Sequence, residues 1–106
     1  MSGRLQDKVA IVVGAGQTPG ETIGNGRATA VLFAREGARV MLVDVHLDSA
    51  RETERMIADE GGESFAFEAD ATDEESCRAV ANACVERYGR IDILHNNIGA
   101  VSYTHL

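Results

Sequence analysis

Basic residues are scarce in this sequence of 106 residues: there are ten, and Lys8 is the only lysine among them. Seventeen acidic residues bring the formal net charge to −7 at pH 7. Proteins that bind nucleic acid or anionic membranes do so through basic surfaces, because these neutralise phosphates. We therefore expect neither nucleic acid nor a membrane among the partners of this chain.

Long apolar runs are also missing. The longest run that ends at a glycine, Val9 to Val13, is far shorter than the roughly 20 residues of a membrane-spanning helix. Residues 1–8 lack the apolar core of a secretory signal peptide. Both absences predict a cytoplasmic protein.

Cysteine is rare, and the chain contains only Cys77 and Cys84. They are seven positions apart in one predicted helix, so about 10 Å separates their Cα atoms, beyond the ~7 Å limit for a disulfide. Both fall on the apolar stripe of that helix, which predicts buried, unreactive thiols. The three histidines have no ligand-like spacing to either thiol, so we expect no metal site.

The hydrophobic pattern changes period repeatedly along the chain. Short apolar runs typical of buried strands alternate with segments in which apolar residues recur at helical spacing. Glycines are expected to end the helices, and capping boxes at 49–52 and 72–75 are expected to begin two of them. The predicted strands are 9–13, 39–44, 64–69 and 91–95, and the predicted helices are 26–36, 49–60 and 72–88.

This alternation predicts an α/β fold of the Rossmann type, a doubly wound parallel sheet with helices on both faces. The expected strand order is 3-2-1-4. It places the third strand, with Phe65 and Phe67 on one face, at an edge of the sheet.

Residues suited to a dinucleotide follow all four predicted strands. Ligands of this fold collect at the carboxyl ends of the strands, near the point where strand order reverses. A glycine-rich loop after the first strand would let the backbone approach a pyrophosphate at a helix N-terminus. The predicted cofactor-binding residues are Gly14, Gly16, Gly24, Asn25, Gly26, Asp44, Asp70, Ala71, Asn96, Asn97 and Gly99.

Each segment alone has a plainer interpretation as a turn or a cap, and the coincidence of four at one edge favours a nucleotide site. Asp44 ends the second strand, where a carboxylate can accept hydrogen bonds from an adenosine ribose and repel a 2′-phosphate. Asp70 can present a carboxylate to an adenine edge. His95 ends a buried strand without a partner in view and is predicted to be structural.

Over about residues 6–100 these motifs together resemble the N-terminal half of the short-chain dehydrogenase/reductase family. In that family a G-x-x-x-G-x-G motif follows the first strand, and Gly14, Gly24 and Gly26 are similar to its glycines. The family's Asn-Asn-Ala-Gly motif after the fourth strand is similar to residues 96–99, where isoleucine replaces alanine.

The resemblance implies an activity, a cofactor and an assembly. It implies hydride transfer between a nicotinamide dinucleotide and an alcohol or carbonyl substrate, in a protein that is a homo-oligomer when intact. Asp44 implies that the cofactor is NAD rather than NADP. Asp70 and Ala71 are similar to the family's adenine-binding turn.

The glycine loop is longer than the family motif. Nine residues separate Gly14 from Gly24 where the family has three, so residues 17–23 are predicted to form a small flap over the pyrophosphate. A literal G-x-x-x-G-x-G also begins at Gly20. We take Gly14 as the first glycine because that glycine should leave the strand directly.

The family's acid–base group is missing from the chain. In the family a tyrosine is activated by a lysine four residues later, and a serine holds the substrate oxygen. Here Asp92 follows Tyr88 at that spacing, and Lys8 precedes the first strand. Ser102 and Tyr103 come too early in the fold to replace them. The chain is therefore predicted to contain no catalytic residue and to be the cofactor-binding part alone.

Residues 101–106 resemble the translation of a transposon-type sequencing adapter. We expect a partial NAD-binding Rossmann domain at residues 1–100 and a non-native tail at 101–106. Two other interpretations stay open. A fragment of a methyltransferase that binds S-adenosylmethionine would also need a glycine loop and acidic turns, and a remnant without function would expose the unpaired edge of its fourth strand.

Overall fold

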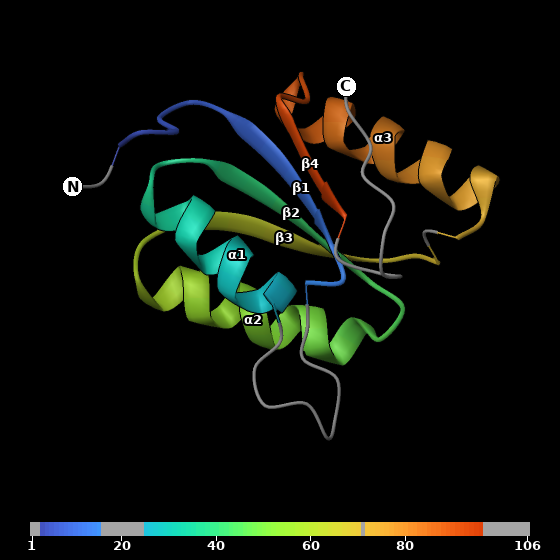
Figure 1. Ribbon diagram of the computed structural model, residues 1–106, viewed down its shortest axis with the longest axis horizontal. Coiled ribbons are helices and arrows are strands. Elements are labelled where there is room, and N and C mark those ends of the chain that lie inside the picture. The colour runs from blue at the N-terminus through green and yellow to red at the C-terminus, as the bar shows by residue number, and fades with distance from the viewer. Residues whose placement is uncertain (1–2, 16–24, 71, 97–106) are drawn as a thin grey trace.

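The structure, a computed structural model, describes residues 3–15, 25–70 and 72–96. Four parallel strands form one sheet in the order β3-β2-β1-β4 (Figure 1). This confirms the predicted α/β fold and its strand order. The elements are β1 (Val9–Val13), α1 (Asn25–Arg35), β2 (Arg39–Asp44), α2 (Leu47–Asp59), β3 (Glu63–Glu68), α3 (Glu74–Tyr88) and β4 (Ile93–Asn96).

Helices cover both faces of the sheet, with α1 and α2 on one side and α3 on the other (Figure 1). Alternate residues of β1 and β2 enter two separate apolar clusters, so both strands are buried on both faces and their sequences are continuously apolar. Val12 and Leu42 pack toward α1 and α2, whereas Val13 and Met41 pack toward α3.

The edge strand β3 is only half-buried along its length. Phe65 and Phe67 both pack against the cluster on the α3 side, as their alternation predicts. The strand occupies residues 63–68 rather than the predicted 64–69, because its register follows β2 from Arg39 opposite Glu63 onward.

Glycines end the helices as predicted. Gly37 has a φ of 98°, and the next residue, Ala38, donates its N–H to Phe33 O at 3.1 Å. Gly89 after α3 has a φ of 84° and donates to Val85 O at 2.8 Å. These positive φ angles are costly for residues with a side chain, and the bonds satisfy carbonyls that a helix end leaves open.

The predicted beginnings of α2 and α3, at residues 49 and 72, were each wrong by two residues. α2 begins at Leu47 after His46, which has no side-chain capping bond, so the capping box at residues 49–52 does not start the helix. Its turn is held instead by the His46 N–H, which donates to Asp44 Oδ1 at 2.9 Å. α3 is capped by Asp73 rather than by residue 72: the Ser76 N–H donates to Asp73 Oδ2 at 3.1 Å.

Strand β4 begins at Ile93, two residues after its predicted start. The preceding residue, Asp92, uses its side chain on the neighbouring strand: Val9 N–H donates to Asp92 Oδ2 at 2.9 Å, and Asp92 N–H donates to Val9 O at 2.8 Å. A carboxylate therefore joins the beginnings of β1 and β4, and the regular ladder starts one residue later.

The two cysteines are free but differ in burial. Cys84 is buried as predicted, and burial, followed by the charge of Asp92, raises the pKa of its thiol to about 11. The prediction for Cys77 was wrong, because this residue is exposed. Burial on α3 begins only at Val80, and Figure 1 shows the first turn of the helix lying beyond the ends of the strands.

The length and hydropathy of the helices show whether any of them could cross a membrane. Within residues 3–15, 25–70 and 72–96, no helix combines the length and the apolar character that crossing a bilayer requires.

Candidate functional site

The carboxyl ends of the strands bring four of the predicted site residues to one edge of the sheet. In the strand register, Val13 lies opposite both Val43 and Asn96, so the positions of Gly14, Asp44 and Asn96 follow or end three neighbouring strands. Asp70 lies two residues beyond the end of β3, whose last residue, Glu68, is opposite Asp44. The expected gathering of these residues at one edge is thus what the topology produces.

The other predicted residues belong to the glycine loop and to the segments that follow the strands. Asn25 is the first residue of α1, and Gly26 follows it in the same helix. The remaining predicted residues lie outside the described residues: Gly16, Gly24, Ala71, Asn97 and Gly99.

The glycine loop leaves β1 at Gly14, which has a φ of 78°. The N–H groups of Gly14 and Ala15 both donate to Val43 O, at 2.7 and 3.1 Å. At the far end of the loop, a Cβ on Gly26 would overlap with the carbonyl oxygen of Gly14. Only a residue without a side chain lets the first turn of α1 pack this closely on the end of β1. This packing brings the N-terminus of α1, where backbone N–H groups favour an anion, close to the carboxyl end of β1.

Asp44 is the last residue of β2 and is partly exposed. The His46 N–H bonds to its Oδ1 at 2.9 Å, and the Ala69 N–H donates to the Asp44 carbonyl at 3.1 Å. Both contacts hold this residue at the carboxyl edge. A carboxylate oriented here can accept hydrogen bonds from a ribose diol.

Asp70 forms the turn between β3 and α3. Its Oδ1 accepts bonds from the Thr72 hydroxyl at 2.6 Å and the Thr72 N–H at 3.0 Å. The hydroxyl bond first, and then the backbone bond, holds the pKa of the Asp70 carboxyl below its usual value. The side chain therefore stays ionised in the folded protein at neutral pH and presents a charged acceptor near the edge.

Thr53 is a component of this region that the sequence did not reveal. It is fully buried on α2, and its hydroxyl donates to the carbonyl of Ala15 at 2.9 Å. The same hydroxyl accepts a bond from Arg27 Nε, in the first turn of α1, at 3.0 Å. The sequence did contain one sign of this role. Thr53 lies at helical spacing from Ala50 and Ile57 on the buried side of α2, and a buried threonine hydroxyl needs polar partners.

Arg27 is held by two further contacts with α2. Its Nη2 lies 2.7 Å from Glu52 Oε1 and donates to Ser49 O at 3.3 Å. The Arg27 side chain is only 15% exposed, whereas that of Glu52 is 63% exposed. The guanidinium therefore fills the space between the two helices beside the glycine loop.

His95 lies half-buried in β4, and its ring contacts that of Phe33 edge-on, with 6.2 Å between centroids. This aromatic contact supports the structural role predicted for His95.

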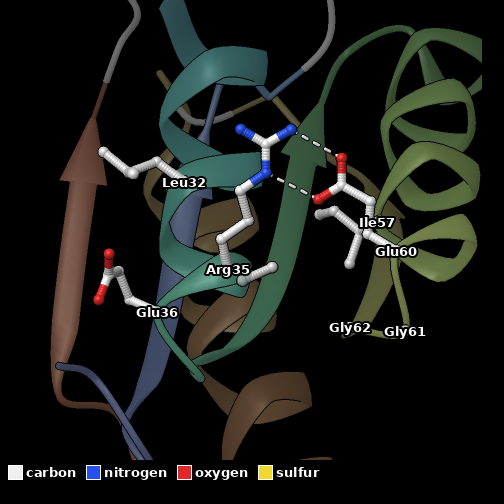
Figure 2. A pocket seen from close by; sticks show the side chains of 8 residues that line it. Leu32, Arg35, Glu36, Ile57, Glu60, Gly61 and Gly62 are labelled. Carbon is white, nitrogen blue, oxygen red and sulfur yellow. Dashed lines mark hydrogen bonds and ion pairs between the residues drawn. The ribbon is translucent and has the colours of Figure 1, made fainter. Parts of the chain in front are cut away.

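A surface depression of about 530 Å³ lies at the other end of the sheet, between the last turns of α1 and α2. Figure 2 shows Arg35 and Glu60 facing each other there, joined by two hydrogen bonds of 2.8 and 2.7 Å. None of the predicted site residues lines this depression. It is therefore separate from the carboxyl edge.

Comparison with known proteins identifies relatives that match most of the chain. The family model of short chain dehydrogenases matches residues 8–105. An uncharacterized oxidoreductase of Bacillus subtilis (strain 168), YxbG, is 42% identical over 97 residues, which cover 92% of this chain and 33% of that relative. The chain thus spans about a third of the length of this relative.

Two solved structures superpose on most of the chain. A 7α-hydroxysteroid dehydrogenase complexed with NADH and 7-oxo glycochenodeoxycholic acid has a TM-score of 0.78 at 36% identity, over 86% of this chain and 33% of that one. A metagenomic short-chain oxidoreductase in complex with NADP has a TM-score of 0.74 at 32% identity, over 85% and 38%. The matches give no support to a methyltransferase, and the chain belongs to the short-chain dehydrogenase/reductase family of oxidoreductases.

Proposed function

We propose that this chain is the cofactor-binding part of an oxidoreductase that transfers a hydride between NAD and a small alcohol or carbonyl compound. The observation that carries the proposal is the convergence of Gly14, Asp44, Asp70 and Asn96 on the carboxyl edge of one parallel sheet. Relatives that were solved with a cofactor support a nicotinamide dinucleotide as the ligand, since one structure contains NADH and another contains NADP.

Each part of the edge has a role in this proposal. The glycine loop and the start of α1 hold the pyrophosphate, because backbone N–H groups and the helix dipole favour an anion there. Asp44 accepts hydrogen bonds from the adenosine ribose, and Asp70 with Ala71 binds the adenine. The loop residues are Gly14, Gly16, Gly24, Asn25 and Gly26, and the ribose next to the nicotinamide is held by Asn96, Asn97 and Gly99.

The preference for NAD over NADP rests on Asp44. The family does not decide it, because relatives are solved with either cofactor. The Asp44 carboxylate is oriented by the His46 N–H at 2.9 Å. A 2′-phosphate on the ribose would meet this negative charge at short range, whereas the 2′-hydroxyl of NAD can donate to it.

Acid–base catalysis is not assigned to this chain. Tyr88 lies at the end of α3, away from the carboxyl edge, with its ring 5.5 Å from that of Phe65. Burial above all raises the pKa of Tyr88, which is the wrong direction for a proton donor that works near neutral pH. The sole lysine, Lys8, stands before β1 at the opposite end of the sheet. The nicotinamide supplies the hydride chemistry, and the residues of the carboxyl edge bind and orient the cofactor.

Equilibrium binding to the chain tests the proposal. NADH fluorescence titration should give saturable binding, and NADPH should bind at least about tenfold more weakly, a difference of about 1.4 kcal/mol. S-adenosylmethionine should not compete with NADH. A folded chain that binds no dinucleotide would favour the remnant interpretation, and equal affinities for NADH and NADPH would remove the role of Asp44.

Hydride transfer itself, and the homo-oligomer that we expect of the intact protein, require a polypeptide of the relatives' length that carries this segment. Oxidation of a panel of small alcohols, followed by NADH absorbance, tests the reaction class. Light scattering of the same preparation gives its oligomeric state. Turnover with a methyl donor instead of NAD would contradict the proposal.

A further inference from the structure

We propose that Thr53 is a positioning residue for dinucleotide binding, because its hydroxyl joins the two ends of the glycine loop. Ala15 lies where the loop leaves β1, and Arg27 lies in the first turn of the helix that follows the loop. Thr53 belongs to neither of these elements, since it is on α2. The inference rests on the proposed function, in which this loop holds the pyrophosphate.

The hydroxyl of Thr53 uses both its donor and its acceptor capacity. It donates to Ala15 O at 2.9 Å and accepts from Arg27 Nε at 3.0 Å. The hydroxyl carries one proton, and two carbonyl oxygens lie within its reach, Ala15 O at 2.9 Å and Ser49 O at 3.3 Å; the shorter contact is the one to Ala15. The guanidinium of Arg27 can only donate, so the hydroxyl oxygen accepts from it. One oxygen atom thus fixes the carbonyl at the loop entrance relative to a side chain at the loop exit.

Burial makes this link stiff. Thr53 is fully buried and its bond to Ala15 O is buried as well, so water does not take the place of the hydroxyl beside that carbonyl when the hydroxyl is removed. The loop entrance is held from the other side as well, because the N–H groups of Gly14 and Ala15 donate to Val43 O. The peptide that begins the loop is therefore held by β2 on one side and by α2 on the other.

Contacts with β1 and with α2 also fix the end of the loop, where α1 begins. Gly26 packs against the carbonyl of Gly14, and the neighbouring Arg27 reaches α2 through Thr53, Ser49 and Glu52. These contacts fix the N-terminus of α1 relative to the end of β1, and the proposed function places the pyrophosphate beside that N-terminus. The position of α1 thus depends on a helix that contributes no residue to the predicted site.

α2 also begins three residues after Asp44, the proposed ribose ligand. The His46 N–H that orients Asp44 immediately precedes the helix. The two ends of the site thus contact α2 through different residues, the ribose end at His46 before the helix and the pyrophosphate loop at Thr53 within it. A change at Thr53 should alter binding of the phosphates while leaving the adenosine half of the site in place.

The test compares Thr53→Val with Thr53→Ser in the full chain, using NADH and adenosine as probes. Valine keeps the shape of threonine without the hydroxyl, and serine keeps the hydroxyl. We expect T53V to bind NADH about tenfold more weakly, as for the loss of a buried hydrogen bond. We expect T53S to remain within about twofold of wild type. Adenosine affinity, measured by NMR titration, should be the same in all three proteins.

Glu52→Gln is the matched control. It removes the charge of the exposed partner of Arg27 and leaves the Thr53 bonds intact, so NADH affinity should stay within about twofold. If circular dichroism shows that T53V does not fold, Arg27→Met replaces it. That variant keeps the bond from Thr53 to Ala15 and removes the link to α1, and it should likewise weaken NADH and spare adenosine.

The outcomes separate the inference from the proposed function. Wild-type chain that is folded and binds no NADH defeats both. Wild-type binding together with unchanged NADH affinity in T53V, or in R27M where that variant replaces it, overturns the inference alone. Equal weakening of NADH and adenosine also overturns it, because such a result indicates general loss of structure. Failure of T53S to retain affinity would show that the hydroxyl is not what matters.

Discussion

The Cα atom of Gly26 lies directly against the carbonyl oxygen of Gly14, so that the first turn of α1 rests on the peptide that ends β1. Twelve positions of sequence separate the two glycines, and together they close the base of the loop. The contact leaves no room for a methyl group, and the carbonyl is backbone, which cannot move aside without shifting β1 or α1.

Gly26→Ala is therefore expected to open the base of the loop. Overpacking of this kind costs about 1–3 kcal/mol, which urea denaturation would measure. NADH affinity should fall with it, by about tenfold or more. Gly61→Ala is the control: its φ of 83° gives a cost in stability, but nothing lies within 4 Å of its Cβ position. Its NADH affinity should be that of wild type, and equal losses in the two variants would contradict the argument.

Asp44→Asn tests the choice of cofactor. The amide oxygen can still accept the His46 N–H, so the turn into α2 should be kept while the charge is lost. We expect the ratio of NADPH to NADH affinity to rise by about tenfold. Asp48→Asn, in the first turn of α2, removes an acidic charge that is near in sequence. An equal change in D48N would mean that net charge, rather than the Asp44 position, sets the preference.

Much of the fold could be predicted because its signals are local. The apolar run of β1 indicates a strand buried on both faces, and Gly37 and Gly89 mark helix ends by the φ angles that they adopt. Parallel strands bring their carboxyl ends to one edge, so the order of the strands along the chain is enough to predict that Asp44 and Asn96 lie at the same edge.

Features that depend on distant contacts could not be predicted. Thr53 bonds to residues 38 and 26 positions away, and no local pattern encodes those partners. The capping box at Ser49 has the right sequence form, yet the turn held by Asp44 and His46 starts α2 earlier. The helical spacing of Cys77 and Cys84 predicts the same burial for both, yet Cys77 is exposed because burial on α3 begins only at Val80.

Acid should destabilise the fold in part through Asp92. The Val9 N–H first, and then Arg90, lowers the pKa of this carboxyl in the folded chain. A group with a depressed folded pKa contributes stability above its unfolded value, about 3.9, and loses it as the pH falls through the folded value. The Asp92→Asn variant should therefore have a lower free energy of unfolding than wild type at pH 7. Near pH 3 the free energies of unfolding of the two proteins should be closer together.

Urea denaturation between pH 7 and pH 3 would measure how the difference in free energy of unfolding between wild type and D92N decreases. Asp59→Asn serves as the control, because it removes an exposed acidic charge in the last turn of α2, away from the link between β1 and β4. A D92N variant whose deficit stays constant with pH would show that the link between β1 and β4 does not depend on the charge of Asp92.

The two thiols should differ sharply in reactivity. Cys77 is exposed, whereas Cys84 is buried, with a pKa raised to about 11 and its thiol 3.6 Å from the carbonyl of Arg90. Since the thiolate is the reactive form, alkylation at pH 8 should label Cys77 alone in the folded chain. Mass spectrometry should find one modification in wild type, none in Cys77→Ser, and two after denaturation. Labelling of Cys84 at the rate of Cys77 would mean that α3 does not stay packed on the sheet.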